Sequence, residues 1–262
     1  MIPPARGDGR PMSVPLLETR GLCRTFGALA AARDIDFRLE AGARHALIGP
    51  NGAGKTTFVN LLTGLIPPTS GQVLLKGRDI TGAAQAARVK LGIARTFQIN
   101  RLFRGLSVLD NVYLAVAERV GAAPAMFRPA GLRRDVVEES MHLLETLKLA
   151  ENARHRISEL PYGRQRLVEL AIALGLKPEV LLLDEPAAGV PSAESHIILD
   201  AIDGLPGHIG VLIIDHDMGL VFRFASRITV LVNGAVFASG GPREIGANPD
   251  VRAVYLGQAA YG

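Results

Sequence analysis

The sequence is poor in cysteine and lacks long hydrophobic runs. Cys23 is the single cysteine among 262 residues, so the chain cannot form an internal disulfide, and this usage suits a reducing compartment. No apolar run approaches the roughly 18 residues that a membrane-spanning helix requires. Runs such as 180–183 and 211–214 have the length and composition of central strands in a parallel sheet. The sequence therefore excludes a disulfide scaffold and offers no transmembrane candidate.

A strong charge of one sign is also missing. The net charge is +4, and 21% charged residues accompany 48% hydrophobic ones, so the chain can bury a substantial core. A net positive charge could indicate binding to a nucleic acid or to an anionic membrane surface, but an ordinary basic protein is the interpretation that we prefer. The length predicts one large domain, or one domain with a subdomain. Residues 1–13 are expected to be a disordered leader, or translation begins at Met12. They do not form a secretory signal, because no hydrophobic segment follows their charged residues.

The most informative positive feature is a glycine-rich segment at 49–56 that fits Gly, four free positions, then Gly-Lys-Thr. A strand pattern precedes it and a helix pattern follows it. Small residues let backbone N–H groups surround an anion, and the helix N-terminus adds a positive field. Lys55 can then reach the β- and γ-phosphates of a nucleotide, and Thr56 can ligate Mg²⁺. The predicted phosphate-binding residues are Gly49, Pro50, Asn51, Gly52, Ala53, Gly54, Lys55, Thr56 and Thr57.

A second chemical element is the run 180–185, in which four apolar residues precede Asp184 and Glu185. Ligands of open α/β sheets bind at the carboxyl ends of the strands. We therefore expect Asp184 to hold Mg²⁺, directly or through water, and Glu185 to act as a general base toward the water that attacks the γ-phosphate. Acidic turns often end strands, but a phosphate loop about 130 residues earlier makes the combination specific.

The order of these patterns predicts an α/β fold interrupted by helices. Strands are expected at 16–22, 35–39, 72–75 and 92–97. Between about 107 and 149 the pattern is helical, with a loop at 121–129. One helical face is predicted to contain Val137, Met141, Leu144 and Leu147. After Pro161 helices and strands alternate again, and the sequence shows no internal repeat and no second phosphate loop.

With these motifs in this order, the chain resembles the ATPase subunits of ABC transporters over about 14–257. The resemblance implies a P-loop NTPase (RecA-like) core, an antiparallel β subdomain and a helical subdomain inserted at about 101–160. It also implies ATP and Mg²⁺ as cofactors, and hydrolysis of ATP to ADP and phosphate that is coupled to transport.

Further site residues are implied only by this resemblance. Phe26 lies where the family has an aromatic that stacks on adenine, and a core aromatic is the alternative. Gln98 matches the glutamine that contacts Mg²⁺ and senses the transmembrane partner. Residues 100–103 are expected to line the docking surface for that partner, and simple loop packing is the equal alternative. His216 matches the histidine that contacts the γ-phosphate, so the implied catalytic set is Glu185, His216 and Gln98. The signature sequence, which contacts the ATP of an opposite subunit, matches Leu160, Pro161, Tyr162, Gly163, Arg164 and Gln165.

The finer resemblance is to ATPases of branched-chain amino acid importers, on the segments 160–163, 215–221 and 248–257. It implies uptake of a small solute, although related branches move amides, urea or other polar solutes and the ATPase does not contact the solute. The implied partners are transmembrane permease subunits, a second ABC ATPase and, indirectly, a periplasmic or extracellular solute-binding protein, with no nucleic acid. The implied location is peripheral, at the cytoplasmic face of the inner membrane.

Two prolines depart from the family pattern. Pro161 stands where most members have a serine whose hydroxyl would donate to ATP of the opposite subunit. Such a hydrogen bond to a charged acceptor contributes about 1.5–3 kcal/mol. The hypothesis is that this chain is the weaker half of an asymmetric pair, so a heterodimer is expected and a homodimer is the alternative. Pro191 stands where Asp or Asn is usual, which removes a polar contact across the interface.

Two other functions are alternatives to transport. A soluble ABC-type ATPase that acts on nucleic acid or ribosomes usually carries two phosphate loops or long coiled-coil arms, and the sequence has neither. A P-loop kinase would need an arginine-rich lid, but would need neither His216 nor a signature segment. Transport is the reading that the complete set of motifs favours.

Overall fold

The computed structural model describes residues 14–96, 102–121 and 133–259. The expected leader at 1–13, Gln98 and most of the loop expected at 121–129 lie outside these residues. Among the residues described, no helix is both long and apolar enough to cross a bilayer.

The chain alternates between strands and helices in an order close to the predicted one. The strands are β1 (Leu17–Phe26), β2 (Leu29–Leu39), β3 (Arg44–Ile48), β4 (Ser70–Leu75), β5 (Arg78–Asp79), β6 (Ile93–Thr96), β7 (Val180–Asp184), β8 (Gly210–Ile214), β9 (Arg227–Val232) and β10 (Ala235–Gly240). The helices are α1 (Lys55–Thr63), α2 (Gln85–Lys90), α3 (Val108–Arg119), α4 (Arg134–Thr146), α5 (Tyr162–Gly175), α6 (Ser192–Asp203), α7 (Met218–Phe224), α8 (Pro242–Ala247) and α9 (Pro249–Ala259), with short 3₁₀ helices η2 (Ala150–Asn152) and η3 (Ile157–Glu159).

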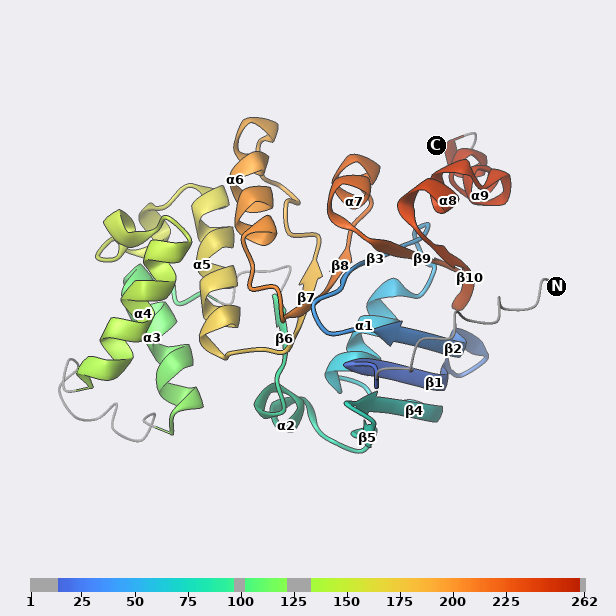
Figure 1. Ribbon diagram of the computed structural model, residues 1–262, viewed down its shortest axis with the longest axis horizontal. Coiled ribbons are helices and arrows are strands. Elements are labelled where there is room, and N and C mark those ends of the chain that lie inside the picture. The colour runs from blue at the N-terminus through green and yellow to red at the C-terminus, as the bar shows by residue number, and fades with distance from the viewer. Residues whose placement is uncertain (1–13, 97–101, 122–132, 260–262) are drawn as a thin grey trace.

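The strands form two sheets (Figure 1). A four-stranded antiparallel sheet has the order β2-β1-β4-β5, and a six-stranded sheet has the order β10-β9-β3-β8-β7-β6. All pairs of the larger sheet from β9 to β6 are parallel, and only the edge strand β10 is antiparallel. This arrangement confirms the predicted α/β class, with a P-loop NTPase core beside an antiparallel β subdomain.

The pairing of the central strands determines where the motifs meet. Leu47 near the end of β3 pairs with Ile214 at the end of β8, and Asp184 at the end of β7 pairs with that same Ile214. Because these strands are parallel neighbours, the loops that follow them leave the sheet at one edge. The phosphate loop, the acidic pair and His216 therefore start from adjacent strand ends.

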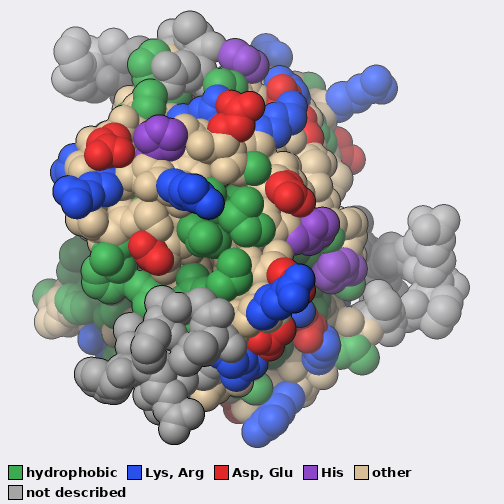
Figure 2. Space-filling view, turned by 90° about the vertical axis from the view of Figure 1, so that its left-hand side faces the viewer, with side chains coloured by type: hydrophobic (Ala, Val, Ile, Leu, Met, Phe, Trp, Pro, Cys, Tyr) green, Lys and Arg blue, Asp and Glu red, His purple; other side chains and the backbone are tan. Residues whose placement is uncertain are grey.

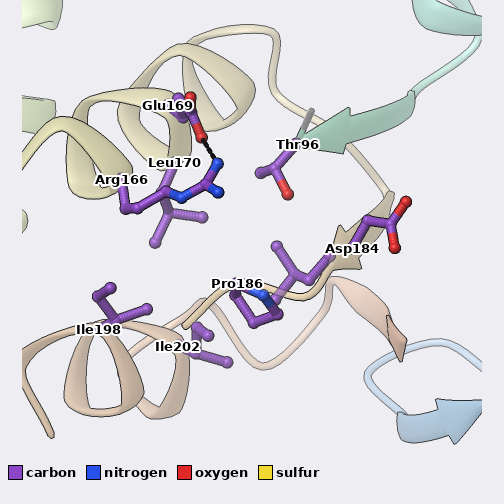
Figure 3. A pocket seen from close by; sticks show the side chains of 9 residues that line it. Thr96, Arg166, Glu169, Leu170, Asp184, Pro186, Ile198 and Ile202 are labelled. Atoms are coloured by element: carbon purple, nitrogen blue, oxygen red, sulfur yellow. Dashed lines mark hydrogen bonds and ion pairs between the residues drawn. The ribbon is translucent and has the colours of Figure 1, made fainter. Parts of the chain in front are cut away.

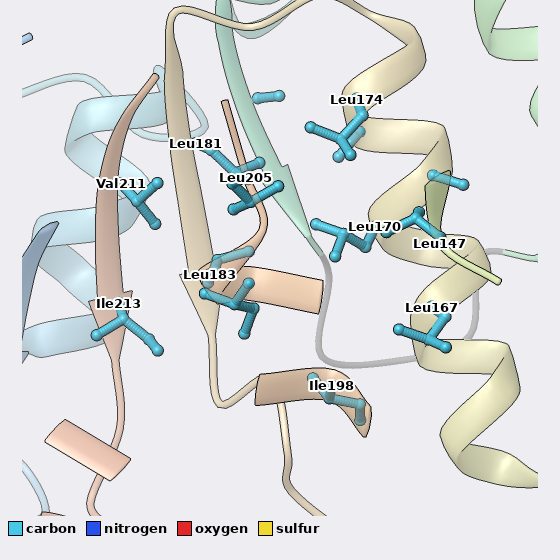
Figure 4. Close-up of a cluster of buried hydrophobic side chains, with 14 of the residues drawn as sticks. Leu147, Leu167, Leu170, Leu174, Leu181, Leu183, Ile198, Leu205, Val211 and Ile213 are labelled. Carbon is cyan, nitrogen blue, oxygen red and sulfur yellow. The ribbon is translucent and has the colours of Figure 1, made fainter. Parts of the chain in front are cut away.

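The central strands are buried on both faces, which explains their continuous apolar sequence. Alternate residues of β7 and β8 contribute to two separate core clusters. On one face, Leu181, Leu183, Val211 and Ile213 lie opposite leucines of α5 (Figure 4). On the other face, Leu182 and Leu212 pack in the cluster that contains Phe58 of the helix after the phosphate loop. The sheet thus connects the phosphate-loop helix on one side to the predicted signature helix on the other.

The helical insert lies at the far side of the molecule from the antiparallel sheet (Figure 1). A capping box between Ser107 and Asp110 begins α3. In α4 the prediction was wrong by one position at the start of the buried face, because Val136 is fully buried and Val137 is only partly so. The physical reason is Ser140, which is buried one turn later and donates its hydroxyl to the Val136 carbonyl oxygen at 2.7 Å. A satisfied polar residue on a core face is invisible to a hydrophobic pattern.

The outer face of this insert carries both signs of charge (Figure 2). On α4, Arg134 pairs with Glu138 at 2.8 Å, and Glu139 lies between Arg119 and Lys177. Basic and acidic side chains are therefore interspersed on the described part of this face, and the net positive charge is not concentrated there.

Candidate active site

The phosphate loop joins β3 to α1 and depends on two glycines. Gly54 caps α1 with a φ of 97°, and a Cβ there would lie 2.4 Å from the Ala31 carbonyl oxygen. Gly49 has a φ of 155°, and its Cβ would lie 2.3 Å from the Leu231 carbonyl oxygen. Only glycine fits these positions, where the loop curls against the neighbouring backbone.

Lys55 lies folded over this loop. Its ammonium donates to the carbonyl oxygens of Gly49 at 2.5 Å and Pro50 at 3.0 Å. Burial lowers the pKa of Lys55, and the nearby carboxylates of Glu185 and Asp184 oppose that shift. An ammonium held by neutral carbonyls can exchange them for phosphate oxygens, which form stronger charge-assisted hydrogen bonds.

The loop forms one wall of an open depression that also contains Glu185. The other walls come from the β1–β2 hairpin and the β9–β10 turn, and the lining residues that the sequence did not predict are Leu29, Ala30, Ala31, Arg33, Asn233 and Gly234. Asn233-Gly234, both at positive φ, is a typical hairpin turn. The Gly234 N–H donates to the Ala53 carbonyl oxygen of the phosphate loop at 2.9 Å. This contact joins segments far apart in the sequence, so no local pattern predicts it.

The acidic pair has one buried and one half-exposed member. Asp184 is 6% exposed and forms an ion pair with Arg95 of β6 at 2.5 Å. Glu185 follows in the left-handed region with a φ of 46°, and its N–H donates to the Ile214 carbonyl oxygen at 2.8 Å. A side chain other than glycine in this conformation is strained, and such strain often accompanies functional positions. The Glu185 side chain lines the depression beside the phosphate loop.

His216 lies beside Glu185 because the turn after β8 is tightly bonded. Asp215 is buried and accepts the N–H groups of His216 at 2.7 Å and Asp217 at 2.9 Å. Burial raises the pKa of Asp215, and the hydrogen bonds from these two N–H groups only partly oppose that shift. Asp217 in turn caps α7 by accepting from Gly219 at 2.8 Å. The resulting separation between His216 Nδ1 and Glu185 Oε1 is 3.4 Å.

Asp184 also borders a small cavity where α5 and α6 meet the sheet (Figure 3). Across this cavity, Arg166 of α5 pairs with Glu169 at 2.8 Å, and both side chains are largely buried. Burial raises the pKa of Glu169, while the Arg166 guanidinium opposes the shift. The helix that carries the predicted signature therefore presents a buried ion pair, internal to the helix, to the cavity that Asp184 borders.

The signature residues begin α5 but do not line the depression beside the phosphate loop. Pro161 is the exposed N-cap of the helix, Leu160 and Gly163 are buried, and Gln165 donates its side-chain amide to the Leu160 carbonyl oxygen at 2.9 Å. Proline is therefore compatible with this helix start, as predicted.

Two other signature side chains make contacts within α5 or from α5 to the helical insert. Tyr162 is 37% exposed, and its hydroxyl accepts from Arg166 at 2.6 Å. Arg164 donates to the Lys148 carbonyl oxygen at 2.7 Å.

Phe26 is 44% exposed at the end of β1, with the Arg24 guanidinium 4.6 Å from the ring centroid. The alternative of a buried core aromatic is therefore wrong. Phe26 does not line the depression, and its stacking on adenine stays a prediction.

The chemistry of the site fits a magnesium nucleotide. The loop offers a cradle of N–H groups and one ammonium for phosphates. Thr56 and Asp184 offer hard oxygen ligands of the kind Mg²⁺ prefers. The carboxylate of Glu185 lines the same depression as Lys55, where it can accept a proton from water.

Known proteins share this fold and sequence. The family model described as ABC transporter matches residues 32–188. The branched-chain amino acid transport ATP-binding protein LivG of Salmonella typhimurium is 39% identical over 95% of this chain and 100% of its own, and BraF of Pseudomonas aeruginosa is 38% identical over the same shares. The solved ADP conformation of MJ1267, an ATP-binding cassette of an ABC transporter, is 30% identical with a TM-score of 0.81, covering 93% of this chain and 99% of that one. This chain therefore belongs to the ABC transporter family, as a subunit that binds and hydrolyses ATP.

Proposed function

We propose that this chain powers the uptake of branched-chain amino acids through a membrane transporter. The observation that carries the proposal is that Lys55 and Glu185 line one depression with the phosphate loop, in a chain whose relatives of nearly equal length are named for branched-chain amino acid transport. Residues 14–257 would form the ATP-binding domain, with the helical subdomain at about 101–160.

Each predicted site residue takes a role in this proposal. The loop N–H groups and Lys55 bind the phosphates. Thr56 and Asp184, with Gln98, would hold Mg²⁺, which neutralises phosphate charge when bound. Glu185 accepts the proton of the attacking water, and His216 beside it contacts the γ-phosphate.

Within one chain, the signature residues do not line the depression beside the phosphate loop. The proposed partners follow from this separation. A second ABC ATPase would place its signature over this chain's depression, so that ATP adds contacts only to the closed pair and favours closure by differential affinity. Permease subunits, supplied by a solute-binding protein, would convert closure into transport, with this chain peripheral at the cytoplasmic face of the inner membrane. The exposed Pro161, which offers no hydroxyl, supports a heterodimer.

The test is uptake by the complete transporter in proteoliposomes, with this chain, its permeases, the second ATPase and the binding protein. ATP inside the vesicles should drive accumulation of radiolabelled leucine, and Lys55→Ala should abolish it. Urea and glutamine serve as competing solutes. Accumulation of urea or glutamine without leucine would refute the proposed substrate, whereas leucine uptake that survives Lys55→Ala would refute the proposed role of this chain.

A further inference from the structure

Arg95 places a buried guanidinium between three elements of the site. It lies on β6 with a side chain that is 9% exposed. Its Nη2 donates to Oδ2 of Asp184 at 2.5 Å, and its Nη1 donates to Oδ1 of Asn60 at 2.7 Å. Arg95 thus connects the acidic strand β7 to the helix α1 that follows the phosphate loop.

The geometry of α1 shows from which side Arg95 reaches Asp184. Asn60 lies four residues after Thr56 on the same helix, so both side chains share one face and Asn60 is one turn further from the phosphate loop. Arg95 therefore approaches Asp184 from one turn behind the predicted metal ligand Thr56. The planar guanidinium makes one bond to Asn60 and one to Asp184, and these fix the direction from which it meets the Asp184 carboxylate.

Only one oxygen of Asp184 is used in this contact. Among the described residues, Oδ2 is the oxygen that Arg95 binds, and Oδ1 has no hydrogen-bond partner. Asp184 is 6% exposed, and a buried carboxylate is stabilised by a nearby opposite charge. Lys55 does not fill that role by direct contact, since its hydrogen bonds go to loop carbonyls.

We propose that Arg95 is a positioning residue that holds Asp184 with one oxygen turned toward the metal side, so that affinity for a divalent cation beside the nucleotide depends on Arg95. The inference rests on the proposed function, in which Asp184 helps to hold Mg²⁺. Partners of this kind, which orient a metal ligand, typically change metal affinity by about 10–100-fold when removed. A guanidinium that merely occupied the place of the metal would have the opposite effect, since its removal would strengthen metal binding.

The experiment measures Mn²⁺ binding by electron paramagnetic resonance, on the full chain with a non-hydrolysable ATP analogue. Arg95→Met should weaken Mn²⁺ affinity by about 10–100-fold. Arg95→Lys, which keeps the charge without the fork, and Asn60→Ala should each weaken it by less. Affinity for the analogue in excess EDTA should stay within about twofold, because Arg95 contacts no phosphate-binding group. Unchanged or tighter Mn²⁺ binding in Arg95→Met would overturn the inference.

Two controls separate the possible failures. Arg88 is also a buried arginine, and it donates only to backbone carbonyls, including Leu61 and Leu62 of α1. Arg88→Lys should leave Mn²⁺ affinity unchanged, and an equal loss in Arg88→Lys and Arg95→Lys would show general loosening of α1 instead. Asp184→Asn tests the underlying function. If Asp184→Asn does not weaken Mn²⁺ binding, the proposed metal role fails, whereas a loss in Asp184→Asn alone refutes only the role of Arg95.

Discussion

His216 Nδ1 lies 3.4 Å from Glu185 Oε1, although the two residues follow different strands. The strands β7 and β8 are parallel neighbours. The Glu185 N–H donates to the Ile214 carbonyl oxygen, and the Asp215 carboxylate accepts the His216 N–H. The imidazole is 72% exposed and the carboxylate 30% exposed, and the carboxylate lines the open depression beside the phosphate loop. The pair is therefore fixed by the sheet and is accessible to a nucleotide.

Glu185→Gln should abolish hydrolysis without abolishing ATP binding. General bases contribute about 10²–10⁴-fold to rate, and an amide cannot accept the proton. His216→Ala should reduce hydrolysis as well, and the double variant should be little slower than Glu185→Gln because the two groups act together. Phosphate release and equilibrium binding of labelled ATP measure the two effects. Multiplicative losses in the double variant would contradict this coupling.

Gly54→Ala should remove nucleotide binding. The added methyl would lie 2.4 Å from the Ala31 carbonyl oxygen at a φ of 97°, so the loop could not keep its present path. We expect at least about a 10-fold loss in ATP affinity by titration calorimetry, because misplaced N–H groups lose charge-assisted hydrogen bonds. The matched control is Gly207→Ala, whose methyl would meet nothing within 4 Å. Tight ATP binding by Gly54→Ala would show that the loop geometry is not essential.

His45 should make the fold sensitive to acid. Burial, with the Arg227 charge, lowers the pKa of His45 from 6.5 to about 4, and its Nε2 lies 2.8 Å from Thr229 Oγ1. Since the folded pKa lies below the unfolded one, the unfolded chain binds the proton first, and stability is lost as the pH falls from about 6.5 to about 4. The loss between pH 7 and pH 5 should be about 2 kcal/mol.

Urea unfolding at the two pH values measures this loss. His45→Gln cannot titrate, so its free energy of unfolding should fall by about 2 kcal/mol less than that of the wild type over the same interval. Equal losses in the two proteins would assign the acid sensitivity to other groups.

Local sequence patterns pointed to the contiguous motifs of the candidate site, but not to the residues from other segments that contact them. The phosphate loop and the acidic strand are contiguous motifs whose chemistry depends on adjacent residues, so spacing alone located them. Arg95 and Asp184 come together only through the pairing of β6 with β7, and no local pattern reveals an arginine that will be buried. The Asn233-Gly234 turn was likewise readable as a turn, but its place beside the loop was not.

The burial of polar residues is a second reason why the sequence did not predict the core positions correctly. Ser140 occupies a core position of α4 because its hydroxyl bonds within the helix, and the hydrophobic pattern therefore chose Val137 over Val136. Phe26 is exposed with Arg24 over its ring, which agrees with an aromatic that offers a ring face and excludes only the core alternative. Both outcomes depend on local hydrogen bonding or packing that the spacing of apolar residues does not report.

Pro161→Ser should raise ATP turnover in the assembled complex. A serine at this exposed N-cap would add a hydroxyl donor for the γ-phosphate of the opposite subunit. One such hydrogen bond corresponds to about a 10-fold effect. Pro161→Ala is the matched control, because it removes the ring without adding a hydroxyl. An unchanged rate in Pro161→Ser would contradict the asymmetric pair.

The central claim is that ATP on this chain's phosphate loop is closed over by a second ATPase that carries a serine in its signature. The most direct measurement is light scattering of Glu185→Gln with ATP and Mg²⁺, alone and mixed with that second ATPase. The account predicts a monomer alone and an ATP-dependent heterodimer in the mixture. An ATP-dependent homodimer of Glu185→Gln, with no heterodimer in the mixture, would contradict it.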